Sequence, residues 1–132
     1  MGVHKWHSEL EIVYESLATN EEKTFRNKSI QEATKFAIEI PFKVMEVSFA
    51  GMELIKAMAE NGNPNSVSDA GVGALCARSA VMGAFMNVRI NAAGYDDKNY
   101  VAEIVKKGTD IQNKAIAMEA EIVKRVNDKI GL

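Results

Sequence analysis

The chain contains 132 residues, which is enough for one domain with a modest hydrophobic core. Its 16 lysine and arginine residues and 18 aspartate and glutamate residues give a net charge of −2, which excludes the basic surplus typical of nucleic-acid-binding proteins. A hydrophobic content of 47% excludes a disordered chain. Because the sequence has only two prolines and no Ser/Gly linker, residues 1–132 are predicted to form a single domain.

Residues 4–18 are predicted to form the first helix. The segment contains no apolar core of signal-peptide length, so we expect a cytoplasmic protein. His4 and His7 stand one helical turn apart, as metal ligands can. Because this segment is terminal, we interpret the pair as part of a surface turn and predict no metal site. The apolar stripe of the helix consists of Leu10, Ile12, Val13 and Leu17.

The second helix is predicted over residues 20–59. Residues 19–22 (TNEE) provide a cap followed by acids in the first turn, where negative charge opposes the helix dipole favourably. Apolar and small residues keep a spacing of three and four on both sides of Pro41, so we expect one continuous helix kinked at the proline. These residues are Ile30, Ala33, Ala37, Ile40, Val44, Val47, Gly51, Leu54 and Met58.

A third helix is predicted over residues 66–90 and a fourth over residues 97–129. The fold class is therefore all-α, a bundle of long, near-antiparallel helices that cross at about 20°. The apolar faces of the second and fourth helices are longer than four unequal helices can cover, so we predict a homodimer or a larger homo-oligomer. In the fourth helix the repeating residues are Val101, Ile104, Gly108, Ile111, Ala115, Met118 and Ile122.

The third helix is long enough to cross a bilayer, yet we interpret it as a core helix and predict no membrane association. It carries Asp69 and Arg78, and a central arginine alone costs about 2.5–3.5 kcal/mol on insertion scales. The single cysteine, Cys76, lies in an apolar run and is predicted to be a buried, reduced thiol. Three glycines inside the helix each cost about 1 kcal/mol relative to alanine, which close packing against a helix or a flat ligand would offset. They are Gly71, Gly73 and Gly83.

A polar loop, residues 63–69, precedes the N-terminus of the third helix. Unpaired backbone N–H groups and the helix dipole make such a position favourable for a carboxylate or a phosphate. The alternative is a simple cap, formed by Asn65 or Ser66 together with Asp69 three residues on. The residues themselves leave both interpretations open.

Further polar residues lie near the C-terminus of the same helix. Asp69 and Asn87 share a face but lie about 27 Å apart along the axis, so one copy of the helix cannot bring them into one site. An antiparallel second copy would bring them near each other. Arg78 and Arg89 also share a stripe. The alternative for Asn87 and Asn91 is that they end the helix by bonding to its last carbonyls.

These motifs resemble the signature of the formimidoyltetrahydrofolate cyclodeaminase family, which includes methenyltetrahydrofolate cyclohydrolases. The matching residues are 62–69 (GNPNSVSD), 71–72 (GV) and 87–91 (NVRIN), with weaker similarity at 30–34 (IQEAT) and 39–41 (EIP). The resemblance implies a folate one-carbon enzyme. Such an enzyme cyclises 5-formimidoyltetrahydrofolate to 5,10-methenyltetrahydrofolate with release of ammonia, or hydrolyses the methenyl ring.

The resemblance also implies roles for individual residues. It implies a tetrahydrofolate derivative as substrate, no metal, a place in histidine degradation and a formiminotransferase as a partner. Asp69 is the candidate for proton transfer, because it is the only carboxylate in the signature. Arg89 would pair with an anionic part of the folate. The side chains that would orient or bind the folate are Asn63, Asn65, Ser66, Ser68, Asn87 and Asn91.

One family feature has no counterpart in this sequence. Family members begin with a Gly-rich segment, roughly PGGGS, before an Ala-rich helix, whereas the nine glycines here are scattered. The chain therefore resembles the later two-thirds of such a domain. Because the resemblance implies that the Gly-rich segment forms part of the folate site, we expect weak or no activity from this chain alone. The alternative function is a non-catalytic helical module that dimerises and binds folate weakly.

Overall fold

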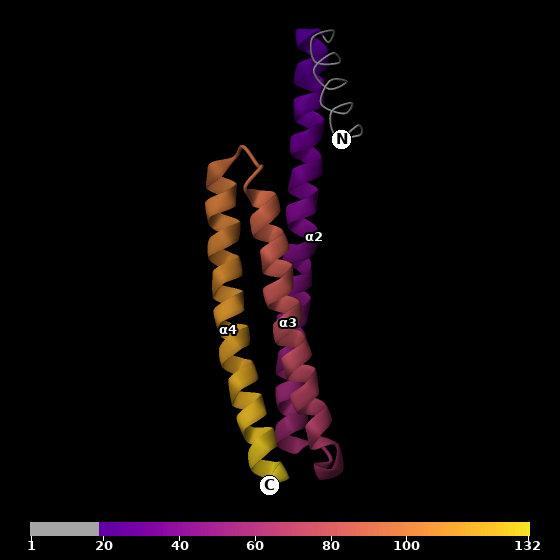
Figure 1. Cartoon of the computed structure of the whole chain (residues 1–132), viewed down its shortest axis with the longest axis vertical. Coiled ribbons are helices and arrows are strands. Elements are labelled where there is room, and N and C mark those ends of the chain that lie inside the picture. Colours follow the sequence, from indigo (N-terminus) through magenta and orange to yellow (C-terminus); the bar gives the residue numbers. More distant parts are fainter. Residues whose placement is uncertain (1–18) are drawn as a thin grey trace, which may run out of the picture. The chain divides into compact units, whose positions relative to one another are not determined.

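The computed structural model describes residues 19–132, and the first predicted helix, residues 4–18, lies outside them. The described residues contain no strand, so the predicted all-α class is confirmed for this part of the chain (Figure 1). The long helices begin and end within two residues of their predicted bounds. They are α2 (Asn20–Asn61), α3 (Val67–Ala92) and α4 (Lys98–Ile130), and a short 3₁₀ helix, η1 (Pro64–Ser66), precedes α3.

The described residues belong to two compact units that divide within α2, between Ala33 and Thr34. In the first unit, Thr19 begins the helix, because its Oγ1 accepts a hydrogen bond from the backbone N–H of Glu22 at 3.2 Å. Glu21 and Glu22 occupy the first turn, as predicted. The helix continues without interruption through Pro41, while a kink at that residue stays a prediction.

In the second unit, residues 34–132, the three long helices pack around a hydrophobic core. α2 contributes Ile38, Met45 and Met52, which are spaced seven residues apart and are completely buried. A seven-residue repeat is what keeps one stripe of a helix against its neighbours over many turns. The core residues from α3 and α4 are Val81, Ala84, Phe85, Val88, Ala92, Ile104 and Ala115. A second buried cluster consists of Ala59, Ala70, Ala74, Ile122 and Val126.

α3 and α4 lie side by side because small residues are placed where the two helices meet (Figure 1). Gly108 of α4 lies directly against the ring of Phe85, so a Cβ at that position would overlap the ring. Gly71 of α3 lies against Val126, and a Cβ there would be 3.1 Å from Val126 Cγ1. Close helix packing, rather than a flat ligand, therefore explains why position 71 is a glycine.

An ion pair crosses the same interface. Arg78 Nη1 of α3 lies 2.9 Å from Glu119 Oε2 of α4, and Glu119 is only 7% exposed. Removing a carboxylate from water is costly unless it is paired and hydrogen-bonded. Arg78 therefore stabilises the packing of α3 against α4 by pairing with this buried carboxylate. Arg89, which was predicted to share its stripe, lies over the ring of Phe85, with its guanidinium carbon 4.7 Å from the ring centroid.

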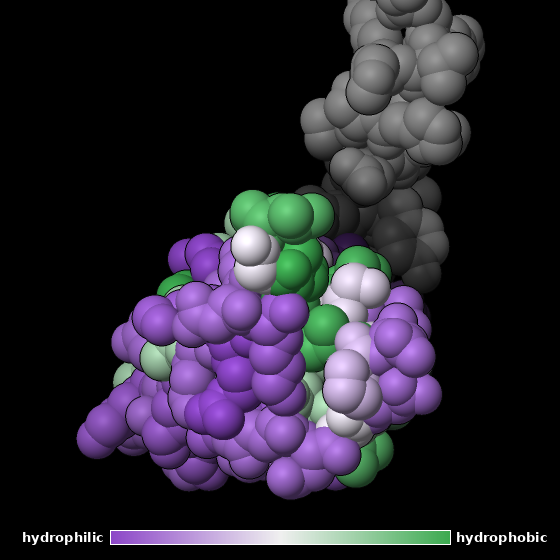
Figure 2. Space-filling model, turned by 90° about the horizontal axis from the view of Figure 1, so that it is seen from below, coloured by the Kyte–Doolittle hydropathy of each residue, from purple (hydrophilic) through white to green (hydrophobic). Residues whose placement is uncertain are grey.

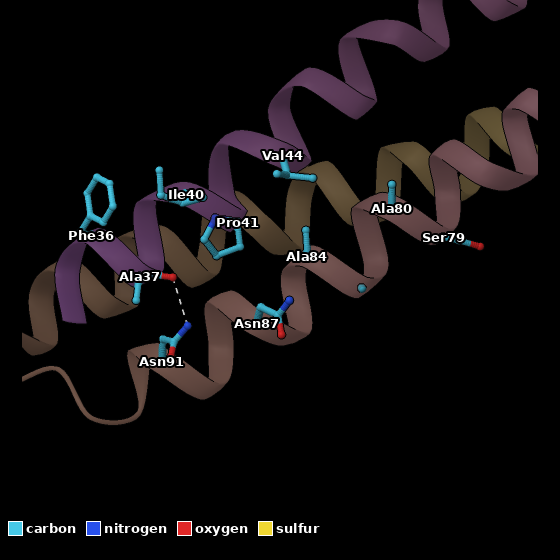
Figure 3. Close-up of a pocket in the computed structure, with 11 residues that line it drawn as sticks. Phe36, Ala37, Ile40, Pro41, Val44, Ser79, Ala80, Ala84, Asn87 and Asn91 are labelled. Carbon is cyan, nitrogen blue, oxygen red and sulfur yellow. Dashed lines mark hydrogen bonds between the residues drawn. The ribbon is translucent and has the colours of Figure 1, made fainter. Parts of the chain in front are cut away.

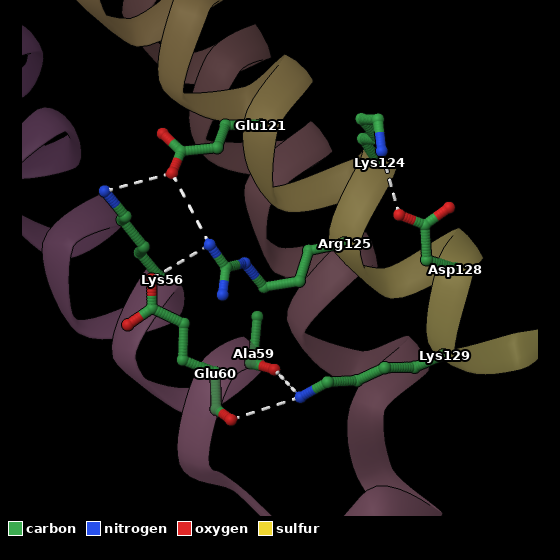
Figure 4. Close-up of polar contacts among 8 residues, drawn as sticks. All are labelled: Lys56, Ala59, Glu60, Glu121, Lys124, Arg125, Asp128 and Lys129. Atoms are coloured by element: carbon green, nitrogen blue, oxygen red, sulfur yellow. Dashed lines mark hydrogen bonds and ion pairs between the residues drawn. The ribbon is translucent and has the colours of Figure 1, made fainter.

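The ends of α2 and α4 are joined by a group of charged residues (Figure 4). The last carbonyls of a helix lack partners within the helix, and positive charge is favourable beside them. α2 has no basic residue in its last turn, and α4 supplies one instead: Lys129 Nζ donates to the carbonyls of Ala59 and Glu60. Arg125 Nη2 lies 3.4 Å from the Glu60 carboxylate, and Lys56 Nζ lies 3.2 Å from that of Glu121.

The prediction that two helices carry uncovered apolar faces holds for α2 but is wrong for α4. The predicted face of α4 is largely buried within the unit, with Gly108, Ala115 and Ile122 among its buried residues. The large apolar residues of the predicted face of α2 are exposed instead, with exposed fractions from 45% to 67%. Together with Phe36, which was not predicted and lies one turn before Ile40, those in the second unit form what we call the α2 stripe: Phe36, Ile40, Val44, Val47, Leu54 and Met58.

α3 presents a second exposed apolar set, which we call the α3 stripe: Val72, Leu75, Met86 and Ile90. Figure 2 views the molecule from below and shows hydrophobic surface at the top of the view and in a band below it, with hydrophilic surface on both sides of the band. Exposed apolar residues that line up along a helix are typical of surfaces that bind another molecule.

Cys76 is exposed, so the prediction of a buried thiol is wrong. Its apolar neighbours Val72 and Leu75 belong to the α3 stripe rather than to the core. The segment Pro64–Ala92 is long and apolar enough to cross a membrane by length and composition, a test that core helices of soluble proteins also pass.

Candidate functional site

A groove of about 660 Å³ lies between α2 and α3 in the second unit (Figure 3). Its size falls within the range of about 300–1,000 Å³ that is common for small-molecule sites. The α2 wall consists of Phe36, Ala37, Ile40, Pro41 and Val44. The α3 wall consists of Ser79, Ala80, Gly83, Ala84, Asn87 and Asn91.

The two walls of the groove differ in chemistry. Phe36, Ile40 and Val44 make the α2 wall apolar, and all three also belong to the α2 stripe. The α3 wall is built from small residues, and Asn87 and Asn91 add polar amides one helical turn apart (Figure 3). An apolar wall opposite a few polar groups suits a flat ring that has hydrogen-bonding atoms along one edge.

Asn91 makes the hydrogen bond that joins the two walls. Its Nδ2 donates to the backbone carbonyl of Ala37 on α2 at 3.1 Å (Figure 3). The interpretation in which Asn91 bonds to the last carbonyls of its own helix is therefore wrong, because this donor contacts a different helix. The pair fixes the distance between α2 and α3 at this end of the groove.

The signature loop lies at the other end of α3. Asn63 Oδ1 accepts a hydrogen bond from the backbone N–H of Asn65 at 3.0 Å and so caps η1. Ser66 occupies the N-cap position of α3, but its side chain makes no capping hydrogen bond. Ser68 and Asp69 lie exposed in the first turn of α3. The predicted cap of α3 by the Ser66 side chain is therefore wrong, and the side chain that caps in this loop is Asn63, which was not predicted to do so.

A single copy of the chain does not bring all the predicted site residues together. Asp69 and Asn87 are separated by 18 positions on α3, which corresponds to about 27 Å along the axis. Asn87 and Asn91 line the groove, whereas the loop residues do not. Arg89 does not line it either, because it covers Phe85. Of the eight candidates, two therefore line the groove, five lie together at the start of α3, and Arg89 lies apart from both groups.

The loop and the groove are nevertheless connected by one exposed face of α3. Residues at successive spacings of three and four along this face are all exposed: Asp69, Val72, Cys76, Ser79, Gly83 and Asn87. Nothing lies within 4 Å of a Cβ built on Gly83, so packing within the described residues does not explain this glycine. Gly73 differs, because a Cβ there would lie 3.4 Å from Ile55 Cδ1, in ordinary contact.

The α2 wall of the groove is the part of the site that the sequence does not predict. Phe36, Ile40 and Val44 carry no polar group that would indicate a binding site, and their spacing is typical of any amphipathic helix. The available signal is Pro41 inside an uninterrupted helix, since a proline there leaves a carbonyl to be bonded from elsewhere. Among residues 19–132, no three His, Cys, Asp or Glu side chains are placed to hold a metal ion.

Comparison with known proteins identifies relatives of this chain. The model of the family described as formiminotransferase-cyclodeaminase matches residues 10–110. Methenyltetrahydrofolate cyclohydrolase of Methylorubrum extorquens is 37% identical over 113 residues, which cover 86% of this chain and 54% of the relative. Formimidoyltransferase-cyclodeaminase of Dictyostelium discoideum is 33% identical over 90 residues, which cover 68% of this chain and 17% of the relative.

The corresponding enzyme of Gallus gallus is 31% identical over 98 residues, which cover 74% of this chain and 18% of the relative. The chain thus spans about half the length of the cyclohydrolase and less than a fifth of each cyclodeaminase. The family match extends over most of the chain and includes both the signature loop and the α3 wall of the groove. The chain therefore belongs to the formiminotransferase-cyclodeaminase family.

Proposed function

We propose that this chain forms the folate site of a one-carbon enzyme, which acts as a cyclodeaminase or as a methenyltetrahydrofolate cyclohydrolase. The observation that carries the proposal is the groove between α2 and α3. Two signature residues, Asn87 and Asn91, line it opposite an apolar wall. A folate combines a flat pterin ring, rich in donors and acceptors, with an anionic glutamate tail, and the ring suits this pairing of walls.

The proposed chemistry is proton transfer beside a positioned folate. Cyclisation with loss of ammonia needs a proton for the departing amine, and hydrolysis of the methenyl ring needs a proton removed from the attacking water. Asp69 is the proposed carrier in both reactions. It lies about 27 Å from Asn87 along α3, so it cannot serve the groove of its own copy.

A second copy of the chain is the proposed solution to this separation. Position 78 is midway between Asp69 and Asn87. A two-fold axis near it, on the exposed face of α3, would place the partner's Asp69 beside the groove of the first copy. The same arrangement would cover the α2 stripe and the α3 stripe, which are exposed in one copy. It would also bring a neighbouring backbone close to Gly83, which faces open space in one copy and as a glycine permits a close approach.

A second candidate is a non-catalytic module that dimerises and binds folate weakly. The separation of Asp69 from the groove favours it. A formiminotransferase partner and a place in histidine degradation belong to the first candidate only.

Calorimetric titration with tetrahydrofolate tests the proposal. Wild-type protein is expected to bind, and Asn87→Ala is expected to weaken binding at least about tenfold, or ~1.4 kcal/mol. Asn113→Ala, an exposed asparagine on α4, is the matched control and should bind as the wild type does. Absence of binding by the wild type, or equal affinities for Asn87→Ala and wild type, would remove the groove as the folate site. Binding without turnover of either one-carbon substrate would select the non-catalytic candidate.

A further inference from the structure

Asn91 bonds to a carbonyl that has lost its regular partner. In an α-helix, the carbonyl of residue 37 accepts a hydrogen bond from the backbone N–H of residue 41. In α2 that residue is Pro41, which has no N–H. Asn91 Nδ2 donates to this same carbonyl oxygen, that of Ala37, at 3.1 Å. The amide on α3 therefore meets the one backbone acceptor in this turn of α2 that the proline leaves free.

We propose that Asn91 is a positioning residue that replaces the hydrogen bond removed by Pro41 and that, once fixed in this way, offers its Oδ1 to the ligand of the groove. A side-chain amide has donors on nitrogen and acceptor sites on oxygen, and the two ends cannot exchange while the nitrogen serves Ala37. Pro41 and Asn91 thus act together. The proline exposes a carbonyl, and that carbonyl selects the orientation of the amide.

This orientation has a consequence for the ligand, and here the inference rests on the proposed folate function. An amide oxygen accepts hydrogen bonds, so the ligand atom beside Asn91 carries an N–H or O–H group. The pterin ring of a folate carries several such donors along one edge, whereas the tail has a single amide N–H and ends in carboxylates, which are acceptors at neutral pH. The geometry therefore assigns the pterin ring to the Asn91 end of the groove, beside Phe36, and directs the glutamate tail away from it.

A double-mutant cycle on stability tests the hydrogen-bond replacement without any ligand. With Pro41 present, Asn91→Ala is expected to lower the folding equilibrium constant about tenfold, or ~1.4 kcal/mol, in urea unfolding. After Pro41→Ala the backbone N–H of residue 41 can bond to Ala37, so Asn91→Ala should then cost less than about threefold. Asn87→Ala is the control and should have the same effect in both backgrounds. An equal loss for Asn91→Ala in both backgrounds would overturn the replacement.

Ligand fragments test the orientation, with Pro41 kept in place so that the Ala37 carbonyl still holds the nitrogen of Asn91. Asn91→Ala should weaken calorimetric binding of a reduced pterin at least about tenfold, or ~1.4 kcal/mol. Binding of p-aminobenzoyl-glutamate, the tail alone, should not change. Equal losses for the two fragments, or no loss for the pterin, would overturn the assigned orientation. If the wild type binds neither tetrahydrofolate nor the fragments, the proposed function and the orientation both fail, and the stability cycle alone decides the hydrogen-bond replacement.

Discussion

At the scale of single residues, replacing Asp69 distinguishes a role in stability from a role in catalysis. Its carboxylate lies in the first turn of α3, so Asp69→Asn should cost roughly 0.3–1 kcal/mol of stability through the helix dipole. Turnover of a methenyl- or formimidoyl-folate should fall at least about tenfold, which is ~1.4 kcal/mol. Thermal unfolding and a steady-state assay measure the two effects. Unchanged turnover beside a small loss of stability would leave Asp69 only the dipole role.

Glycines that look alike in the sequence differ in what surrounds them. Gly108→Ala would drive a methyl group into the ring of Phe85, and we expect a loss of about 1–3 kcal/mol in urea unfolding. Gly51→Ala is the matched substitution at a position where a Cβ meets nothing within 4 Å. It should stabilise the folded monomer by up to about 1 kcal/mol through helix propensity. The same sign for both substitutions would contradict the packing described here.

The sequence predicts which site residues are polar but not which of them meet. The signature identifies Asn87 and Asn91 by type, and the structure shows that both line one groove. The partner of Asn91 is a backbone carbonyl of α2, which Pro41 marks as free, but no residue type shows which side chain reaches it. Asp69 carries the right chemistry but lies at the far end of a rigid helix. Such a distance follows from the helix rise alone and was therefore predictable.

At the scale of helices, the limits of α2, α3 and α4 follow from capping residues and apolar spacing. What the sequence does not reveal is which of two apolar stripes on α2 faces the core. The predicted set, which includes Val47, is exposed, and the completely buried set is Ile38, Met45 and Met52. Both sets are apolar and both have helical spacing. Only packing against α3 and α4 distinguishes them.

This difference predicts two kinds of destabilisation. Met45→Ala removes a completely buried side chain and should cost about 2–5 kcal/mol at every protein concentration. Val47→Ala alters the exposed stripe and should cost stability only at concentrations where the chain associates with itself. Urea unfolding at two widely separated protein concentrations resolves the two cases. A large loss for Val47→Ala at high dilution would place that residue in the core.

The ion pair between α3 and α4 should matter more than ion pairs on the surface. Arg78→Ala would leave the buried carboxylate of Glu119 without its partner, so we expect a loss of about 1–3 kcal/mol. Lys124→Ala breaks an exposed pair with Asp128 of equal length, 2.9 Å, and should cost about 0.5 kcal/mol or less. Chemical denaturation of both variants supplies the comparison. Equal losses would show that burial adds nothing to the pair.

At the scale of the whole molecule, the exposed face of α3 predicts how two copies meet. With a two-fold axis near position 78, the two copies of Cys76 would lie about 6 Å apart along the helix axes. Helices in contact are about 8–10 Å apart, so a short bis-maleimide should span the two thiols. We expect a covalent dimer that is absent for Cys76→Ser, and a dimer mass in light scattering. A monomer mass at micromolar concentration would contradict this assembly.

The exposed α2 stripe also determines whether the stability of this protein depends on its concentration. If a second copy covers that stripe, folding and association are one linked equilibrium, and the melting temperature becomes a property of the solution rather than of the chain. Each tenfold increase in protein concentration would then add about 1.4 kcal/mol to the stability of the assembled form. A dilute sample and a concentrated sample of the same protein would melt at different temperatures. Inside a cell, the amount of chain synthesised would itself set how much of it stays folded.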